Sequence, residues 1–117
     1  MTTVRKLSIA LTAVAFVLVS IAPANASGAT SVNIVCGGSN VKHEMISAGT
    51  KASTQRMAAW NCGGTVGVAD ISYFNGITSR GPYIYAHSHA TKSNIFLIGA
   101  HHRVRNTSNV IIASRTT

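Results

Sequence analysis

Hydrophobic and polar residues alternate in short runs along most of the chain that follows the N-terminal apolar block. Branched residues among Ser and Asn predict a strand from Thr30 to Cys36. Alternation over residues 40–47 predicts a second strand, with Val41, His43 and Met45 on one face. We therefore expect two strands separated by the Gly-Gly pair that follows the first.

The later part of the chain repeats this short-strand pattern. Between Thr50 and Asn61 a strand and a short helix both fit the sequence. Val66 to Phe74 reads as a strand that closes at Asn75-Gly76, a strong hairpin-turn signal, and residues 109–114 add another branched run. Five to seven short strands at spacings of about ten residues predict an all-β fold, a small antiparallel β-sandwich or barrel.

Residues 83–101 favour a hairpin with its turn at residues 90–93. Because side chains alternate along a strand, that hairpin has an outward or cleft-facing side and a core side. The outward side would carry Tyr83, Tyr85, His87 and His89, and the core side would carry Ile84, Ala86, Ile95 and Leu97.

The N-terminal block has the layout of a secretory signal peptide. Arg5 and Lys6 precede an apolar run from Leu7 to Ala22, and small residues follow at 24–26. The run covers about 24 Å as a helix, which is shorter than the ~30 Å hydrocarbon core of a bilayer. A cleaved signal is therefore favoured over a permanent anchor.

The Ala-Asn-Ala pattern predicts cleavage before Ser27. Residues 1–26 are then a removed signal peptide, and residues 27–117 form a single secreted domain. The longest later apolar run, Ile95 to Ala100, is too short to span a membrane. We expect an extracellular protein that is not an integral membrane protein.

Cys36 and Cys62 are the only cysteines, and an oxidising compartment favours their pairing in one disulfide. Closing a loop of about 27 residues stabilises a fold by roughly 3 to 3.5 kcal/mol in the chain-entropy model. A redox pair usually has Cys-x-x-Cys spacing and a zinc site needs four ligands, so a structural bridge is the better interpretation.

The formal charge of +8 suggests an anionic partner or serves solubility alone, and the composition leaves both interpretations open. Arg103 and Arg105 share one face of a predicted strand. Outside a cell, the candidate anions are lipid head groups, envelope polymers and acidic glycans. We do not expect nucleic acid, because Tyr83, Tyr85 and Phe96 belong to no recognised nucleic-acid motif.

Four histidines, His87, His89, His101 and His102, raise the hypothesis of a metal site. The predicted hairpin separates His102 from His87 by roughly 17 to 20 Å along the strands. A Zn–N bond measures about 2.1 Å, so these side chains do not converge in that geometry. We expect neither a metal nor a cofactor.

An enzyme would have to work with Glu44 and Asp70, the only carboxylates in the chain. A secreted ribonuclease could use Glu44 or His87 as base and Arg80 to hold phosphate, but their spacing forms no motif. The sequence also lacks a Gly-x-Ser-x-Gly elbow. A non-enzyme is the favoured interpretation, with a small hydrolase as the alternative.

The chain resembles the lactococcin 972 type of secreted bacteriocin. The resemblance rests on Thr54-Gln55-Arg56, Trp60 and Thr65-Val66-Gly67, together with the Tyr- and His-rich stretch from Tyr85 to Lys92. It implies a small exported cationic β-sandwich protein that interferes with cell-wall synthesis by binding the lipid-linked precursor.

Taken together, these features predict a secreted cationic binding protein, antimicrobial and directed at an anionic component of the cell envelope. A secreted structural or inhibitory binding module is the alternative outside the antimicrobial class. The sequence does not specify an oligomeric state. The expected binding residues are Tyr83, Tyr85, His87, His89, Arg103 and Arg105.

Overall fold

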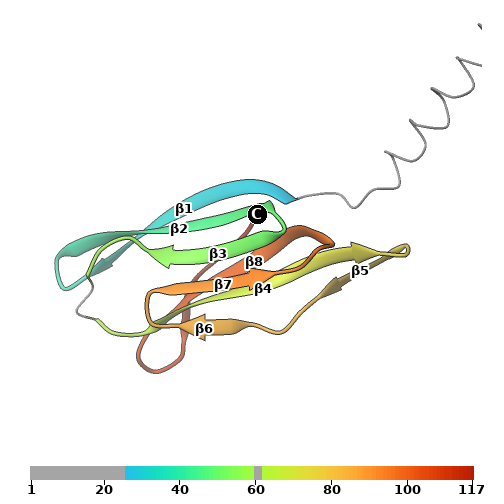
Figure 1. The fold of residues 1–117 in the computed structure, drawn as a ribbon. Coiled ribbons are helices and arrows are strands. Elements are labelled where there is room, and N and C mark those ends of the chain that lie inside the picture. The colour runs from blue at the N-terminus through green and yellow to red at the C-terminus, as the bar shows by residue number, and fades with distance from the viewer. Residues whose placement is uncertain (1–25, 60–61) are drawn as a thin grey trace, which may run out of the picture.

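The computed structural model describes residues 26–59 and 62–117 (Figure 1). Every regular element within these two ranges is a β-strand. None of the described segments forms a helix of the length and hydropathy that a membrane crossing requires. The predicted signal peptide lies outside the described residues except for Ala26, where the first strand begins.

The first sheet, sheet A, contains four antiparallel strands in the order β1-β2-β3-β7. Its strands are β1 (Ala26–Cys36), β2 (Ser39–Gly49), β3 (Lys51–Arg56) and β7 (His89–Ser93). The strand β3 occupies the region where the sequence left a strand and a helix open. Its side chains alternate between buried and more exposed positions, as expected for a strand with one face on a core.

The second sheet, sheet B, is also antiparallel and has the order β5-β4-β8-β9, with β6 paired to β4 beside β5. Its strands are β4 (Thr65–Phe74), β5 (Ile77–Arg80), β6 (Ile84–Ala86), β8 (Leu97–Arg105) and β9 (Ile111–Thr116). The two sheets are curled and lie face to face as a half-barrel (Figure 1). The prediction of a small antiparallel all-β fold is confirmed.

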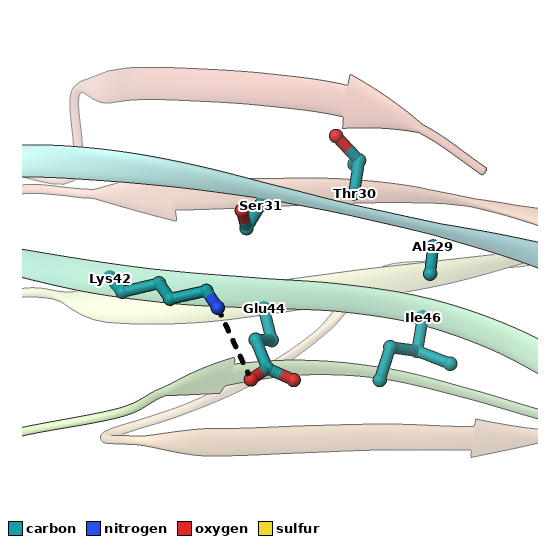
Figure 2. Close-up of a pocket in the computed structure, with 6 residues that line it drawn as sticks. All are labelled: Ala29, Thr30, Ser31, Lys42, Glu44 and Ile46. Atoms are coloured by element: carbon teal, nitrogen blue, oxygen red, sulfur yellow. Dashed lines mark ion pairs between the residues drawn. The ribbon is translucent and has the colours of Figure 1, made fainter.

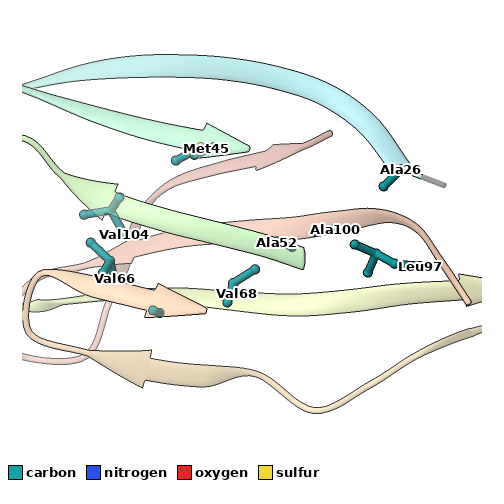
Figure 3. Packing of buried hydrophobic residues seen from close by; sticks show 9 residues of the cluster. Ala26, Met45, Ala52, Val66, Val68, Leu97, Ala100 and Val104 are labelled. Carbon is teal, nitrogen blue, oxygen red and sulfur yellow. The ribbon is translucent and has the colours of Figure 1, made fainter. Parts of the chain in front are cut away.

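The core lies between the two sheets and is built from small and medium side chains (Figure 3). Val41, His43 and Met45 are buried on one face of β2, as the alternation predicted. The central apolar cluster contains Ala26, Met45, Ala52, Val66, Val68, Ala90, Leu97, Ala100 and Val104. Because so few large side chains are buried, a covalent link between the sheets has a large share in holding them together.

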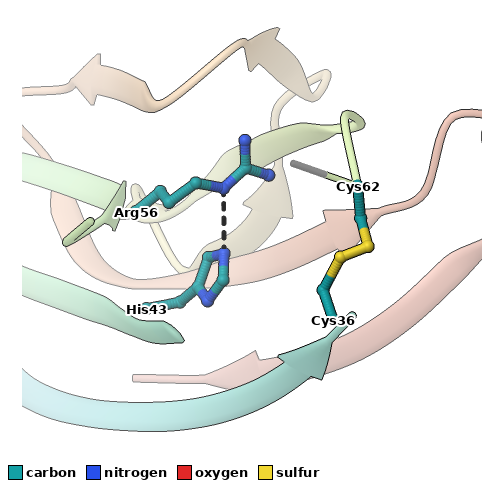
Figure 4. Close-up of a disulfide and its surroundings, with 4 residues drawn as sticks. All are labelled: Cys36, His43, Arg56 and Cys62. Carbon is teal, nitrogen blue, oxygen red and sulfur yellow. Dashed lines mark hydrogen bonds between the residues drawn. A yellow bond between two sulfur atoms is a disulfide. The ribbon is translucent and has the colours of Figure 1, made fainter. Parts of the chain in front are cut away.

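The Cys36–Cys62 disulfide supplies that link, as predicted (Figure 4). Cys36 is the last residue of β1 in sheet A, and Cys62 precedes β4 of sheet B. Their Cα atoms are 6.0 Å apart, within the usual range for a disulfide. Positive φ angles of 55° and 85° at Gly37 and Gly38 form the tight turn between β1 and β2.

The predicted turn at Asn75-Gly76 is also confirmed. Asn75 has φ of 52° and Gly76 has φ of 80°, and the two residues join β4 to β5. Positive φ at both central residues is typical of the type I′ turn, which matches the twist of the flanking strands.

The predicted hairpin over residues 83–101 is wrong. The supposed turn at 90–93 lies in β7, which pairs with β3 of sheet A. The short strand β6 pairs with β4 of sheet B rather than with β8. Ala90 is buried in the core and lies opposite Thr54, so β7 covers the open edge of β3 and satisfies its hydrogen bonds there.

The burial expected from that hairpin is only partly correct. Leu97 is fully buried and Ala86 packs against the core, as predicted. Ile84 and Ile95 were expected in the core but are 44% and 67% exposed. The reason is the pairing: β6 lies at the edge of sheet B, and Ile95 lies in the connection that leads from sheet A to sheet B.

Candidate functional site

Two tyrosines and three arginines alternate along sheet B, and we call this group the Tyr-Arg ladder. The tyrosine rings stack with their centroids 5.7 Å apart; one tyrosine directly precedes β6 and the other lies inside it. Arginines from β5 and β8 lie over these rings. The ladder consists of Arg80, Tyr83, Arg103, Tyr85 and Arg105.

The contacts within the ladder are close. The guanidinium carbon Cζ of Arg103 lies 3.9 Å from the ring centroid of Tyr83, and that of Arg105 lies 3.4 Å from Tyr85. Arg80 is more distant, at 5.1 Å from Tyr83. Such cation–π contacts stabilise an exposed pair by about 0.5 to 1 kcal/mol, so the arginines are held in place rather than freely rotating in solvent.

Hydrogen bonds orient the same arginines further. Arg103 donates from Nη1 to the hydroxyl oxygen of Tyr85 at 3.3 Å, and this contact raises the pKa of the arginine above its usual value. Arg105 donates from Nε to the hydroxyl of Thr65 at 3.1 Å. Both arginines are therefore partly immobilised on the sheet.

Gly67 in the middle of β4 makes the ladder sterically feasible. It lies opposite Tyr85 on one side and opposite Arg103 on the other, so the three residues form one row across sheet B. A Cβ atom at this position would overlap the ring of Tyr85. The absence of a side chain lets the tyrosine ring lie flat on the sheet, the use of glycine expected where a close approach is needed in a strand.

Among residues 26–59 and 62–117, no carboxylate forms an ion pair with an arginine of the ladder. The chain has two acidic residues, Glu44 and Asp70, and each lies beside a lysine, at 3.9 Å from Lys42 and 3.2 Å from Lys92 respectively. Burial alone would raise the pKa of Asp70, but hydrogen bonds from Asn94 and Lys92 outweigh it and hold that pKa below its usual value. Both side-chain carboxylates therefore pair with lysines outside the ladder.

Four of the six predicted binding residues meet in the ladder, namely Tyr83, Tyr85, Arg103 and Arg105. The two histidines do not belong to a common row with them. The chain crosses from sheet B to sheet A after Ala86, and His89 begins β7 opposite Gln55. His87 lies in the crossing, where its backbone carbonyl accepts a hydrogen bond from Arg56 at 2.8 Å.

Sequence reasoning missed the role of Arg80 and Gly67 in this site. Arg80 was considered only as a phosphate ligand of a ribonuclease, since its distance in sequence from residue 103 concealed their common contact with Tyr83. Gly67 lies between the branched residues Val66 and Val68, and a glycine inside such a strand is a signal that a ring or another backbone approaches it closely.

A chain of hydrogen bonds crosses the interior between the two sheets. Thr54 donates to the carbonyl of Gly67 at 2.7 Å, so its oxygen accepts the proton on Nδ1 of His102 at 2.8 Å. Nε2 of His102 is then the acceptor from the Thr117 hydroxyl at 2.8 Å, and Ser47 bonds to Thr117 in turn. The buried His102 is thereby held as one neutral tautomer.

Burial lowers the pKa of both interior histidines, His102 and His43. Desolvation, followed by the nearby His101, lowers the pKa of His102 to about 4. Desolvation also lowers the pKa of His43, which accepts a hydrogen bond from Nε of Arg56 at 3.2 Å near the disulfide (Figure 4). These histidines are structural groups of the core.

The residues of the hypothetical metal site and of the hypothetical ribonuclease site do not come together among the described residues. Across residues 26–59 and 62–117, no three His, Cys, Asp or Glu side chains cluster in a way that could hold a metal ion. Glu44 lines a shallow depression of about 250 Å³ on β1 and β2, where it pairs with Lys42 (Figure 2). Arg80 and His87, its supposed partners in a ribonuclease, are not part of that lining.

No family model, curated protein or solved structure matches the chain. The resemblance to the lactococcin 972 family therefore stays a prediction from sequence motifs.

Proposed function

We propose that this chain is a secreted cationic binding protein whose Tyr-Arg ladder binds an anionic component of a cell envelope. The observation that carries the proposal is the set of three arginines that lie over tyrosine rings of sheet B, none of which forms an ion pair with a carboxylate of the described residues. A guanidinium that no carboxylate neutralises keeps its charge available to an anionic ligand. The signal-peptide pattern supports a target outside the cell of origin.

The stacked geometry suits a phosphate or carboxylate ligand. A guanidinium lying on an aromatic ring keeps its N–H edge available, and that edge matches two oxygens of one anionic group. Arg103 and Arg105 are two residues apart on β8, about 7 Å along the strand, so they can engage neighbouring anionic groups of a polymer or a surface.

Replacing Arg103 and Arg105 together with Gln should reduce affinity for a soluble polyanion such as polyphosphate by about tenfold, since two charge-assisted contacts are lost. Binding of the unmodified protein should also weaken as salt rises from about 50 to 500 mM, because the Debye length falls from roughly 14 to 4 Å. Titration followed by fluorescence or calorimetry measures both effects.

The matched control replaces Lys42 and Lys51 on sheet A with Gln, which removes the same net charge from the other sheet. Equal weakening in the two double variants would mean that overall charge, and not the ladder, determines binding. Affinity that ignores both salt and the ladder substitutions would leave the positive charge as a solubility feature.

We further propose an antimicrobial role, which the resemblance to secreted bacteriocins and the cationic surface support. The secreted protein should produce a growth-inhibition zone on Gram-positive lawns, and the Arg103 and Arg105 double variant should produce a smaller one. Inhibition that persists undiminished in this variant would separate the antimicrobial activity from the ladder.

A further inference from the structure

One end of sheet B carries a group of exposed apolar side chains, which we call the apolar tip. It is formed by the hairpin that joins β4 to β5 and by the connection between β7 and β8 (Figure 1). Its exposed members are Tyr73, Phe74, Ile77 and Ile95, and the half-buried Phe96 completes it by packing against Phe74. Ile77 and Ile95 are 65% and 67% exposed, which is unusual for clustered branched residues in a protein with so small a core.

The tip is a defined structure rather than two independent loops. The backbone N–H of Tyr73 donates to the carbonyl of Phe96 at 3.0 Å, and the rings of Phe74 and Phe96 lie 4.4 Å apart. Asn94 fixes the second segment, because its side chain accepts from the Phe96 N–H at 2.9 Å and donates to Asp70 at 2.8 Å. The apolar side chains are therefore held together at the end of the sheet.

Charged side chains flank the two segments that form the tip but do not occur within them. Residues 71–79 and 93–100 contain no charged side chain. Arg80 follows the first of these segments and stacks on Tyr83, so it lies where the tip meets the Tyr-Arg ladder. Cations begin where the apolar residues end, and the side-chain carboxylate that borders this region, Asp70, pairs with Lys92.

We propose that the tip inserts into the interfacial region of an anionic lipid bilayer while the ladder contacts its head groups; this rests on the proposed function and specifies its target as a lipid surface. From the Asn75-Gly76 turn to Arg80 the strand covers about 13 Å. Interfacial segments bury about 5 to 10 Å of their apolar side, so Arg80 lies at head-group depth.

The size of the tip favours a bilayer over a protein partner. A stable protein interface takes roughly 20 to 30 residues from each side, whereas the tip offers four exposed apolar side chains and Phe96 at one end of sheet B. A bilayer requires no complementary shape, and aromatic side chains are enriched at its interface. Anionic head groups also complement the charge of the adjoining ladder.

The test compares Phe74→Asp and Ile77→Asp with Val35→Asp, using the secreted protein and vesicles of phosphatidylglycerol and phosphatidylcholine. Val35 is a matched control, because it is 70% exposed and lies on β1 beside the disulfide. The tip variants should partition into vesicles about tenfold less than the unmodified protein, since an apolar contact is replaced by a charge. Val35→Asp should change the partition less than about twofold.

Insertion itself is measured with single-tryptophan reporters in a Trp60→Phe background, because Trp60 would otherwise contribute to the emission. The emission of Phe74→Trp should shift to the blue on vesicle binding and should be quenched by brominated lipid, and the emission of Val35→Trp should not. Similar quenching of both reporters, or equal vesicle binding by all three Asp variants, would overturn insertion through the tip. Loss of self-association without loss of vesicle binding in Phe74→Asp would also overturn it, in favour of a second copy.

Binding to polyphosphate separates this proposal from the function proposed above. The tip variants should keep the polyphosphate affinity of the unmodified protein, because they leave the ladder intact. A protein that binds polyphosphate through the ladder but shows no tip-dependent vesicle binding would retain the proposed function and refute the inserted tip. Tip-dependent binding to vesicles without any polyphosphate affinity would instead refute the proposal that the ladder binds anionic groups.

Discussion

Replacing Cys36 and Cys62 together with Ser should lower the free energy of unfolding by about 3 kcal/mol, because the 26-residue separation closes a loop that otherwise adds entropy to the unfolded chain. Small domains are commonly stable by about 5 to 15 kcal/mol, so the loss is a large fraction of the total. The disulfide also joins the end of β1 to the segment before β4, and thus sheet A to sheet B. Urea unfolding of the two proteins at neutral pH measures the difference.

A reductant provides the internal control. Added thiol should lower the urea midpoint of unfolding of the unmodified protein to that of the double variant. It should leave the midpoint of the double variant unchanged. Intact mass after alkylation of the purified protein supplies a second check, since it should reveal no reactive thiol before reduction and two afterwards. Free energies of unfolding that agree within about 0.5 kcal/mol would show that the packing between the sheets is sufficient without the bridge.

Lowering the pH from 7 to 4 should destabilise the protein by about 3 kcal/mol through His102 alone. The pKa of His102 is about 4 in the folded chain, against 6.5 when the side chain is solvated. The unfolded state therefore binds more protons between these values, and stability falls as pH falls through this window. Below about pH 4 the folded state also binds the proton, and this contribution to the loss levels off.

The variant His102→Gln should lose less stability over the same pH range, although it is less stable at pH 7 because the contacts with Thr54 and Thr117 are altered. His89→Gln is the matched control, since it removes an exposed imidazole from β7 and should leave the acid-induced loss in place. Denaturant titrations at several pH values give the comparison. A pH profile of His102→Gln parallel to that of the unmodified protein would assign the acid sensitivity to other groups, such as His43.

The proposed binding of an anionic envelope component and the proposed insertion into a bilayer depend on two different features of sheet B. The ladder provides charge that is fixed and unneutralised, and the tip provides apolar surface at one end of it. A ligand that is a soluble envelope polymer would need only the first feature. A lipid surface is favoured as the target because the cationic ladder and the apolar tip occur together on one sheet.

The sequence alone was sufficient for features that depend on neighbouring residues. Alternation placed Val41, His43 and Met45 on the buried face of β2, because successive side chains in a strand point to opposite sides. Asn75-Gly76 predicted its turn, because these two residue types tolerate the positive φ angles that the hairpin requires. The pairing of two cysteines required no structure at all.

Only the tertiary structure decided which strands lie side by side. Residues 90–93 carry weak strand signals, yet they form β7 because Ala90 fits the core and the edge of β3 is open. That pairing breaks up the expected row of tyrosines and histidines: Tyr85 lies in sheet B, His87 in the crossing and His89 in sheet A. It also places Arg80 and Arg103, distant in sequence, over the same ring of Tyr83. Local periodicity fixes the face of a residue, whereas strand partners depend on burial and hydrogen bonding summed over the whole chain.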